Sequence, residues 1–324
     1  MKKILWTIVI VTLIAGGIYL YFHLQKPAPA RHAPAKASTE MTTPQPLTNE
    51  QSDDMTTSSN EDNAPTVANI HDVRLELPAP RTDNAHPQAI IVDVMVGDEV
   101  NYTSYYDPHT YAAMWVAYSI TAKDMGDIKR PSKWSYNPEI DTEAQVNLCS
   151  RSYNDGYSRG HLIPNASRNG NAERQEQTFY VTNSVPQIQN GFNGGIWQRL
   201  EAAVQDIAET ETIYVTTGVA FNKCGQTMDI AYTTAKMDDK QVPIPNYFYK
   251  VVLKVDSDDS GNVTDAHAIG FWFEHRSYTD KFMEYAVSVD TIEAWTGFDF
   301  FASLPNDIEA LAEANSSWES FMQF

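Results

Sequence analysis

The chain has 324 residues, 42% of them hydrophobic, which is enough for one sizeable core. Its formal net charge is −19, from 23 lysines and arginines against 42 aspartates and glutamates. A protein that holds duplex nucleic acid through a broad basic face does not have this balance, so any phosphate contact should come from local basic patches.

The N-terminal quarter does not have a globular composition. Ile4–Phe22 is an uncharged apolar run long enough to cross a hydrocarbon layer as a helix. We therefore interpret residues 1–25 as a transmembrane anchor, with a cleaved signal and secretion as the alternative. Residues 26–75 are rich in Pro, Thr, Ser, Asn and Ala and predict a flexible linker. Residues 76–324 then form one domain held on the extracytoplasmic side, in the periplasm or at the cell surface.

Only two cysteines occur, Cys149 and Cys224. They are too few for a zinc site of their own. An exported domain could join them in a disulfide, and two unpaired buried thiols are the alternative.

The predicted elements mix strands and helices without regular alternation, which indicates an α+β fold rather than a doubly wound one. Apolar and β-branched runs predict strands at Ala89–Val96, Met114–Ala122, Thr178–Thr182, Thr212–Phe221, Tyr247–Val255 and Ala266–Phe273. Helices are predicted at Asp290–Trp295, at Pro305–Ala314 and from about Asn193 onwards, where Ile196, Leu200, Val204 and Ile207 form one core stripe.

Basic residues gather in two places despite the acidic total. The loop Ala122–Trp134 carries Lys123, Lys129, Arg130 and Lys133, and Tyr157–Gln205 carries four arginines. These two patches are where the sequence predicts phosphate contact.

The second patch also contains residues suited to phosphodiester hydrolysis, which requires an activated water and positive charge against the phosphate. His161, at one arm of a predicted hairpin, is a candidate general base. Asn193 offers a carbonyl oxygen of the kind that Mg²⁺ accepts, and Glu201, two turns later, is a candidate acceptor for metal-bound waters. Arg159 and Arg199 have the planar fork that pairs with phosphate oxygens.

Each candidate has a structural alternative. Asn193 also suits a helix N-cap. Glu201 also suits a solvated helix face, and Arg159 and Arg199 also suit surface salt bridges.

If the pKa of His161 is near the reference of about 6.5, the rate should fall below roughly pH 6 as the base is protonated.

Three blocks resemble the signatures of the DNA/RNA non-specific endonucleases, the ββα-metal family that includes the Serratia-type nuclease and mitochondrial endonuclease G. They are Y-S-R-G-H-L-I-P at Tyr157–Pro164, F-Y-V-T-N-S-V-P-Q at Phe179–Gln187 and F-N-G-G-I-W-Q-R-L-E at Phe192–Glu201. Further similarity lies at Trp115–Thr121, Tyr214–Phe221, Ile244–Leu253 and Thr296–Pro305. The resemblance runs from about residue 88 to the C-terminus.

The resemblance implies a ββα-metal nuclease fold, with a central antiparallel sheet flanked by helices. It implies that His161 is the general base, that Asn193 binds Mg²⁺ or Mn²⁺, and that Glu201 is the downstream acidic residue. Asn183 matches an asparagine that shapes the site and is assigned to substrate binding, as are Arg159 and Arg199. Arg159 and Glu201 are also counted with the catalytic set.

The sequence departs from the family pattern at Ser158, where an aspartate is usual, and at Gln205, where some members have an arginine. We expect lowered or altered activity rather than its loss, because base and metal ligand are both retained. The expected function is metal-dependent, non-specific hydrolysis of DNA and RNA. The alternatives are a catalytically weakened module that binds a polyanion or protein partner, and a phosphodiesterase for smaller substrates. DNA or RNA preference, an inhibitor protein and the oligomeric state are left open.

Overall fold

The computed structural model describes residues 67–79 and 86–323, so the apolar run at 4–22 and most of the predicted linker lie outside the described residues. Within the described ranges, no helix has the length and apolar character needed to cross a bilayer. Ala68 and Leu75 are fully buried in the main core. Packing therefore begins inside the end of the range that the sequence assigns to the linker.

A seven-stranded sheet forms the centre of the domain, in the order β1, β2, β3, β6, β9, β10, β11. Its strands are β1 Ile90–Val96, β2 Glu99–Asp107, β3 Ala112–Ile120, β6 Ile213–Ala220, β9 Tyr247–Ser257, β10 Val263–Glu274 and β11 Ala286–Val287. Every neighbouring pair is antiparallel, which confirms the predicted sheet. β2 was not predicted from the sequence, because its buried positions include Asn101, Thr103 and Ser104 in place of an aliphatic run.

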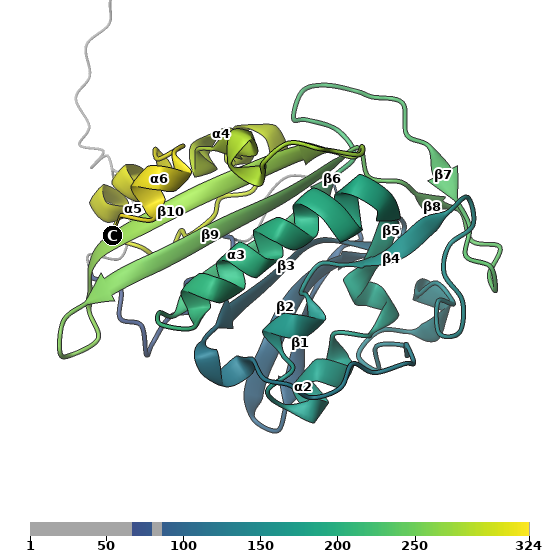
Figure 1. Cartoon of the computed structure of the whole chain (residues 1–324), viewed down its shortest axis with the longest axis horizontal. Helices are drawn as coiled ribbons and strands as arrows, with labels where there is room; N and C mark the ends of the chain where they lie inside the picture. The colour runs from purple at the N-terminus through teal and green to yellow at the C-terminus, as the bar shows by residue number, and fades with distance from the viewer. Residues whose placement is uncertain (1–66, 80–85, 324) are drawn as a thin grey trace, which may run out of the picture. The chain divides into compact units, whose positions relative to one another are not determined.

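Helices cover both faces of this sheet, as Figure 1 shows for α3 on one side. The helices are α2 Ala172–Gln177, α3 Gln198–Ala208, α4 Val289–Thr296, α5 Asn306–Glu313 and α6 Trp318–Phe321. Short helical turns lie at η1 Ala122–Asp124, η2 Thr142–Ala144, η3 Asn165–Ser167, η4 Val181–Asn183 and η6 Phe282–Tyr285. Trp197, just before α3, packs on Phe248 and Phe273, with ring centroids 5.7 and 5.9 Å away. Trp295 of α4 packs on Trp272 of the opposite face, at 4.9 Å.

The predicted core stripe of α3 is confirmed, because Ile196, Leu200, Val204 and Ile207 are all buried. The preceding segment Gln189–Trp197, called η5, is a wide helical turn in which four residues have non-helical backbone angles. Asn193 lies in this turn, before the regular helix begins.

A small hairpin stands beside this turn (Figure 1), formed by β4 Tyr157–His161 and β5 Ser184–Ile188. The predicted second arm, Thr178–Thr182, was wrong: that segment leads into η4, and the arm begins at Ser184. The other two-stranded pair joins β7 Tyr232–Thr233 to β8 Val242–Pro243. Both cysteines are free thiols, so the disulfide considered from the sequence is absent from the described residues.

Gly160 directly precedes His161 in β4. Glycine fits at this position because the buried side chain of Gln187 occupies the space where a Cβ would be. An added Cβ would lie 2.2 Å from Gln187 Oε1 and 2.6 Å from Gln187 Cβ. A change to alanine therefore forces a fully buried side chain out of its site.

We predict that Gly160→Ala lowers the free energy of unfolding by about 1–3 kcal/mol through overpacking, measured by urea denaturation. In a Gln187→Gly background, the same change should cost much less, since the conflict is gone. An equal cost in both backgrounds would contradict this account of the hairpin.

Candidate active site

A cavity of about 580 Å³ lies between the hairpin and the N-terminal half of α3. It collects side chains from four separate segments, including the basic loop. The lining residues are Arg130, Trp134, Ser152, Ser158, Arg159, His161, Pro164, Asn165, Ala166, Gln189, Asn193, Gly194, Gln198, Glu201, Ala202 and Gln205. His161 and Asn193, which are 32 positions apart in the sequence (193 − 161), thus face the same cavity.

His161 is held between two aromatic rings. Its imidazole lies 4.6 Å from the ring of Trp134 and 4.9 Å from that of Phe179, measured between centroids. The same two rings carry guanidinium groups, Arg159 over Trp134 at 4.9 Å and Arg130 over Phe179 at 5.2 Å. The imidazole of His161 therefore lies near two positive charges.

This setting lowers the pKa of His161 to about 3, first through burial and then through repulsion from Arg130 and Arg159. Nε2 is enclosed and has no hydrogen-bond partner among the described residues. The imidazole is therefore neutral throughout the physiological pH range, and in the substrate-free protein it is a weak proton acceptor. The sequence-based expectation that the rate falls below pH 6 assumed an unperturbed pKa for His161. With a pKa of about 3, His161 is not protonated near pH 6, so this environment does not predict that loss of rate.

Asn193 is fixed by its amide nitrogen. Nδ2 donates to Ser158 Oγ at 2.9 Å and to Gln189 Oε1 at 3.3 Å. Ser158 Oγ in turn donates to the carbonyl of Gln187 at 2.8 Å. With both partners accepting from Nδ2, Oδ1 is the atom of Asn193 left to bind a cation. The N-cap of α3 is Trp197, so the N-cap interpretation of Asn193 was wrong.

Glu201 reaches the cavity from α3, above the buried Lys250 of β9. Burial raises the pKa of Glu201 and lowers that of Lys250, and the attraction between the two charges opposes both shifts. Lys250 Nζ donates to Thr217 Oγ1 and lies 5.1 Å from the centroid of the Trp197 ring. Glu201 is thus a partly buried acidic group with a cation beneath it, and the solvated helix face considered for it does not describe this position.

The remaining predicted residues divide into two groups. Arg159 lines the cavity, and it donates through Nη1 to the carbonyl of Leu148 at 2.7 Å, which leaves other N–H groups of its guanidinium for a ligand. Arg199 does not line the cavity; it is exposed, and it donates to the carbonyl of Asp280 at 3.0 Å. Asn183 is buried away from the cavity, where it bonds the backbone of Ile163 and Thr178. Asn183 therefore holds the chain that follows His161.

Several cavity residues were not singled out from the sequence. Arg130 was seen only as one member of a basic loop, and its place beside the base depends on how that loop folds. Lys250, which lies outside the cavity lining, is in a strand that the sequence predicts correctly, but its electrostatic interaction with Glu201 depends on how α3 packs on the sheet. Gln189 and Trp134 gave no signal of their own.

A sequence model of a family described as DNA/RNA non-specific endonuclease matches residues 92–307. The chain is 27% identical over 213 residues to "Nuclease EXOG, mitochondrial" of Mus musculus, covering 63% of this chain and 56% of the relative. It is 29% identical over 216 residues to "Nuclease" of Serratia marcescens, covering 64% and 76%. The match spans 56–66% of the length of the first three curated relatives.

The fold is similar to that in a crystal structure of the EndoG/EndoGI complex, with a TM-score of 0.56, 23% identity, and coverage of 64% of this chain and 85% of that one. The protein therefore has a mixed α/β fold with a large antiparallel sheet, similar to the fold of EndoG. Since the family match covers most of the chain, the protein belongs to the DNA/RNA non-specific endonuclease family.

We predict that Arg130→Gln raises the pKa of His161, because removing a nearby positive charge favours the imidazolium. The pKa should stay below 6.5, since burial is the largest cause of its lowering. The measurement is an NMR titration of the imidazole ring carbons. Lys133→Gln, an equal charge change at an exposed residue of the same loop, is the control and should have little effect. A pKa that falls or stays fixed in Arg130→Gln would contradict the repulsion.

Proposed function

We propose that this protein is a metal-dependent endonuclease that hydrolyses phosphodiester bonds of DNA and RNA with little sequence preference. The observation that carries the proposal is the shared cavity, which His161 enters from the hairpin and Asn193 from the turn before α3. Membership of the family supports the same reaction class.

In this proposal, neutral His161 accepts a proton from a water as the water oxygen bonds to phosphorus and the bond from phosphorus to the leaving oxygen breaks. Nδ1 is the acceptor, because Nε2 is enclosed. Arg159 and Arg130 contact phosphate oxygens, and their charges offset the negative charge that develops there.

The donor groups fit a hard divalent cation, since the hydrogen bonds made by Nδ2 direct the carbonyl oxygen of Asn193 to the ligand role. Bound Mg²⁺ or Mn²⁺ would supply positive charge at the phosphate. Burial raises the pKa of Glu201 to about 7, and attraction to Lys250 opposes this rise, so much of the carboxyl group is ionised near neutral pH. In that form Glu201 would accept hydrogen bonds from waters of the ion.

Lack of sequence preference follows from the groups involved. Arginine and a metal ion address phosphate, which carries no base identity. We further propose that Ile4–Phe22 anchors the protein in a membrane and that the domain lies on its extracytoplasmic side. The support for this location is the apolar run and the composition of the segment after it.

The alternative of a weakened binding module relied on Ser158 in place of aspartate and on the acidity of the chain. In the structure, Ser158 still bonds the nitrogen of Asn193, so this change does not release the proposed metal ligand. The catalytic proposal is therefore favoured.

We predict that His161→Ala lowers the rate of supercoiled plasmid cleavage by about 10²–10⁴-fold, the range typical of a lost general base. His109→Ala removes an exposed histidine that has no place in the cavity, and it should cleave at the wild-type rate. Circular dichroism shows whether both variants remain folded. Undiminished turnover by folded His161→Ala would remove this residue as the base.

A second prediction concerns the metal. EDTA should stop cleavage, and Asn193→Ala should raise the Mg²⁺ concentration needed for half-maximal rate steeply. Ser158→Ala should shift it in the same direction by less, about 10-fold, as expected when a partner of a metal ligand is removed. Asn190→Ala is the matched control, three positions away and outside the cavity. Full activity in chelator would point to a metal-free reaction.

A further inference from the structure

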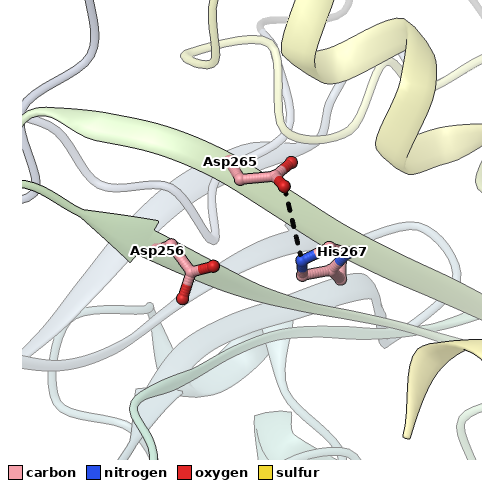
Figure 2. Close-up of side chains that lie close together, drawn as sticks. All are labelled: Asp256, Asp265 and His267. Atoms are coloured by element: carbon pink, nitrogen blue, oxygen red, sulfur yellow. Dashed lines mark ion pairs between the residues drawn. The ribbon is translucent and has the colours of Figure 1, made fainter. Parts of the chain in front are cut away.

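Two groups of side chains outside the active site have metal-ligating atoms close together. One consists of Asp256, Asp265 and His267 on the paired strands β9 and β10 (Figure 2). Both aspartates are exposed, and Asp265 Oδ2 already lies 3.9 Å from His267 Nε2. Nothing about this group requires an ion.

The other group joins α4 to α5. It consists of Asp290 and Glu293 from α4 and Glu313 from the end of α5, each contributing a carboxylate oxygen within 4.8 Å of the others. A Ca²⁺ ion binds oxygen at about 2.4 Å. Three oxygens within this spacing therefore need at most a small inward movement of the side chains to contact one ion placed between them.

Glu313 is the unusual member, because its side chain is only 4% exposed. Its Oε1 atom is enclosed and has no hydrogen-bond partner among the described residues. Burial of a carboxylate without a partner is strongly unfavourable. The packing of the two helices gives no reason for a glutamate at this position.

Other negative charges surround it. Burial and the carboxylates of Glu293, Glu309, Asp290 and Asp299 raise the pKa of Glu313 to about 10. Among the described residues, no ion pair includes any of these five carboxylates. The N–H of Phe300 donates to Glu293 Oε1 at 2.7 Å, which restrains the carboxylate of Glu293.

We propose that Asp290, Glu293 and Glu313 form a binding site for Ca²⁺ that joins α4 to α5. Three carboxylates without nitrogen or sulfur ligands suit a hard cation, and a site with several protein oxygens suits Ca²⁺ better than Mg²⁺, which keeps most of its waters. Glu309 is near enough to add charge from the next turn of α5.

This site is separate from the catalytic cavity. Alternate residues of β10 point to opposite faces of the sheet: Trp272 contacts Trp295 of α4, whereas Phe273 contacts Trp197 on the side of α3. Glu309 and Glu313 also lie beyond residue 307, where the family match ends. Of the three proposed ligands, Asp290 and Glu293 lie within the matched range and only Glu313 lies outside it.

The test is thermal unfolding of the purified full chain, stripped with EDTA, dialysed, and titrated with CaCl₂ or MgCl₂. Ca²⁺ at about 100 times its Kd should raise Tm by roughly 5–10 °C, following mass action for a ligand of the folded state. Mg²⁺ should raise it less. Calorimetric titration with CaCl₂ gives the stoichiometry.

Variants distinguish the sites. Glu313→Gln should abolish the rise in Tm with Ca²⁺, and Asp307→Asn, an equal charge change at an exposed residue of α5, should retain it. Asn193→Ala should also retain it, which excludes binding at the catalytic cavity. The proposal is overturned if Ca²⁺ has no saturable effect on the wild type, or if Glu313→Gln responds as strongly as the wild type. A third outcome would also overturn the proposal: the Tm of the wild type does not change with Ca²⁺, and Glu313→Gln is more stable than the wild type in the absence of Ca²⁺. Glu313 would then be a protonated carboxyl group and not a Ca²⁺ ligand.

Discussion

The hydrogen bond from Asn193 Nδ2 to Ser158 Oγ connects the two halves of the site. One half is a hairpin and the other is the irregular turn before α3, and side chains in such a turn are not oriented by a regular helix. Because Ser158 is also bonded to the backbone of β5, the asparagine is held by a fixed acceptor. A serine can do this as an aspartate can, but without charge. The cavity is consequently less negative than the family pattern implies, which favours a phosphate and disfavours a cation.

The proposed base and the proposed phosphate-binding arginines are packed against the same two aromatic rings. Trp134 touches both His161 and Arg159, and Phe179 touches both His161 and Arg130. The rings that bury the imidazole thus also bring the guanidinium groups near it, so the low pKa of His161 and the positive cavity have a common cause. Binding of a phosphate would neutralise part of this positive field and raise the pKa of the base. The imidazole would then accept a proton more readily with substrate present than in the free protein.

Strands with long apolar runs were predictable from the sequence, whereas the polar strand β2 and the irregular segments were not. The strands β6, β9 and β10 are buried on both faces and give continuous apolar runs. The second arm of the hairpin was misplaced because Thr178–Thr182 has strong β propensity, whereas the true arm contains Pro186. Proline is tolerated there because the pair has only two strands, so one edge of β5 needs no donor for a further strand. The motif residues His161 and Asn193 were found from the sequence. Arg130 was not assigned to the site, and Lys250 was not placed near Glu201, because only the tertiary fold brings these residues together.

The acidic composition and the nuclease proposal are compatible because electrostatic effects are local at physiological salt. The Debye length is about 8 Å there, so a phosphate inside the cavity experiences Arg130 and Arg159 far more than the exposed acidic groups elsewhere on the surface. A long polyanion approaching from solvent is instead repelled by the protein as a whole, because the total charge is −19. In the proposed reaction, two arginine contacts would release few counterions, which would keep binding weak and its salt dependence shallow. Weak, phosphate-directed binding suits repeated cleavage at unrelated sequences, because no base contact must be broken before the next site is engaged.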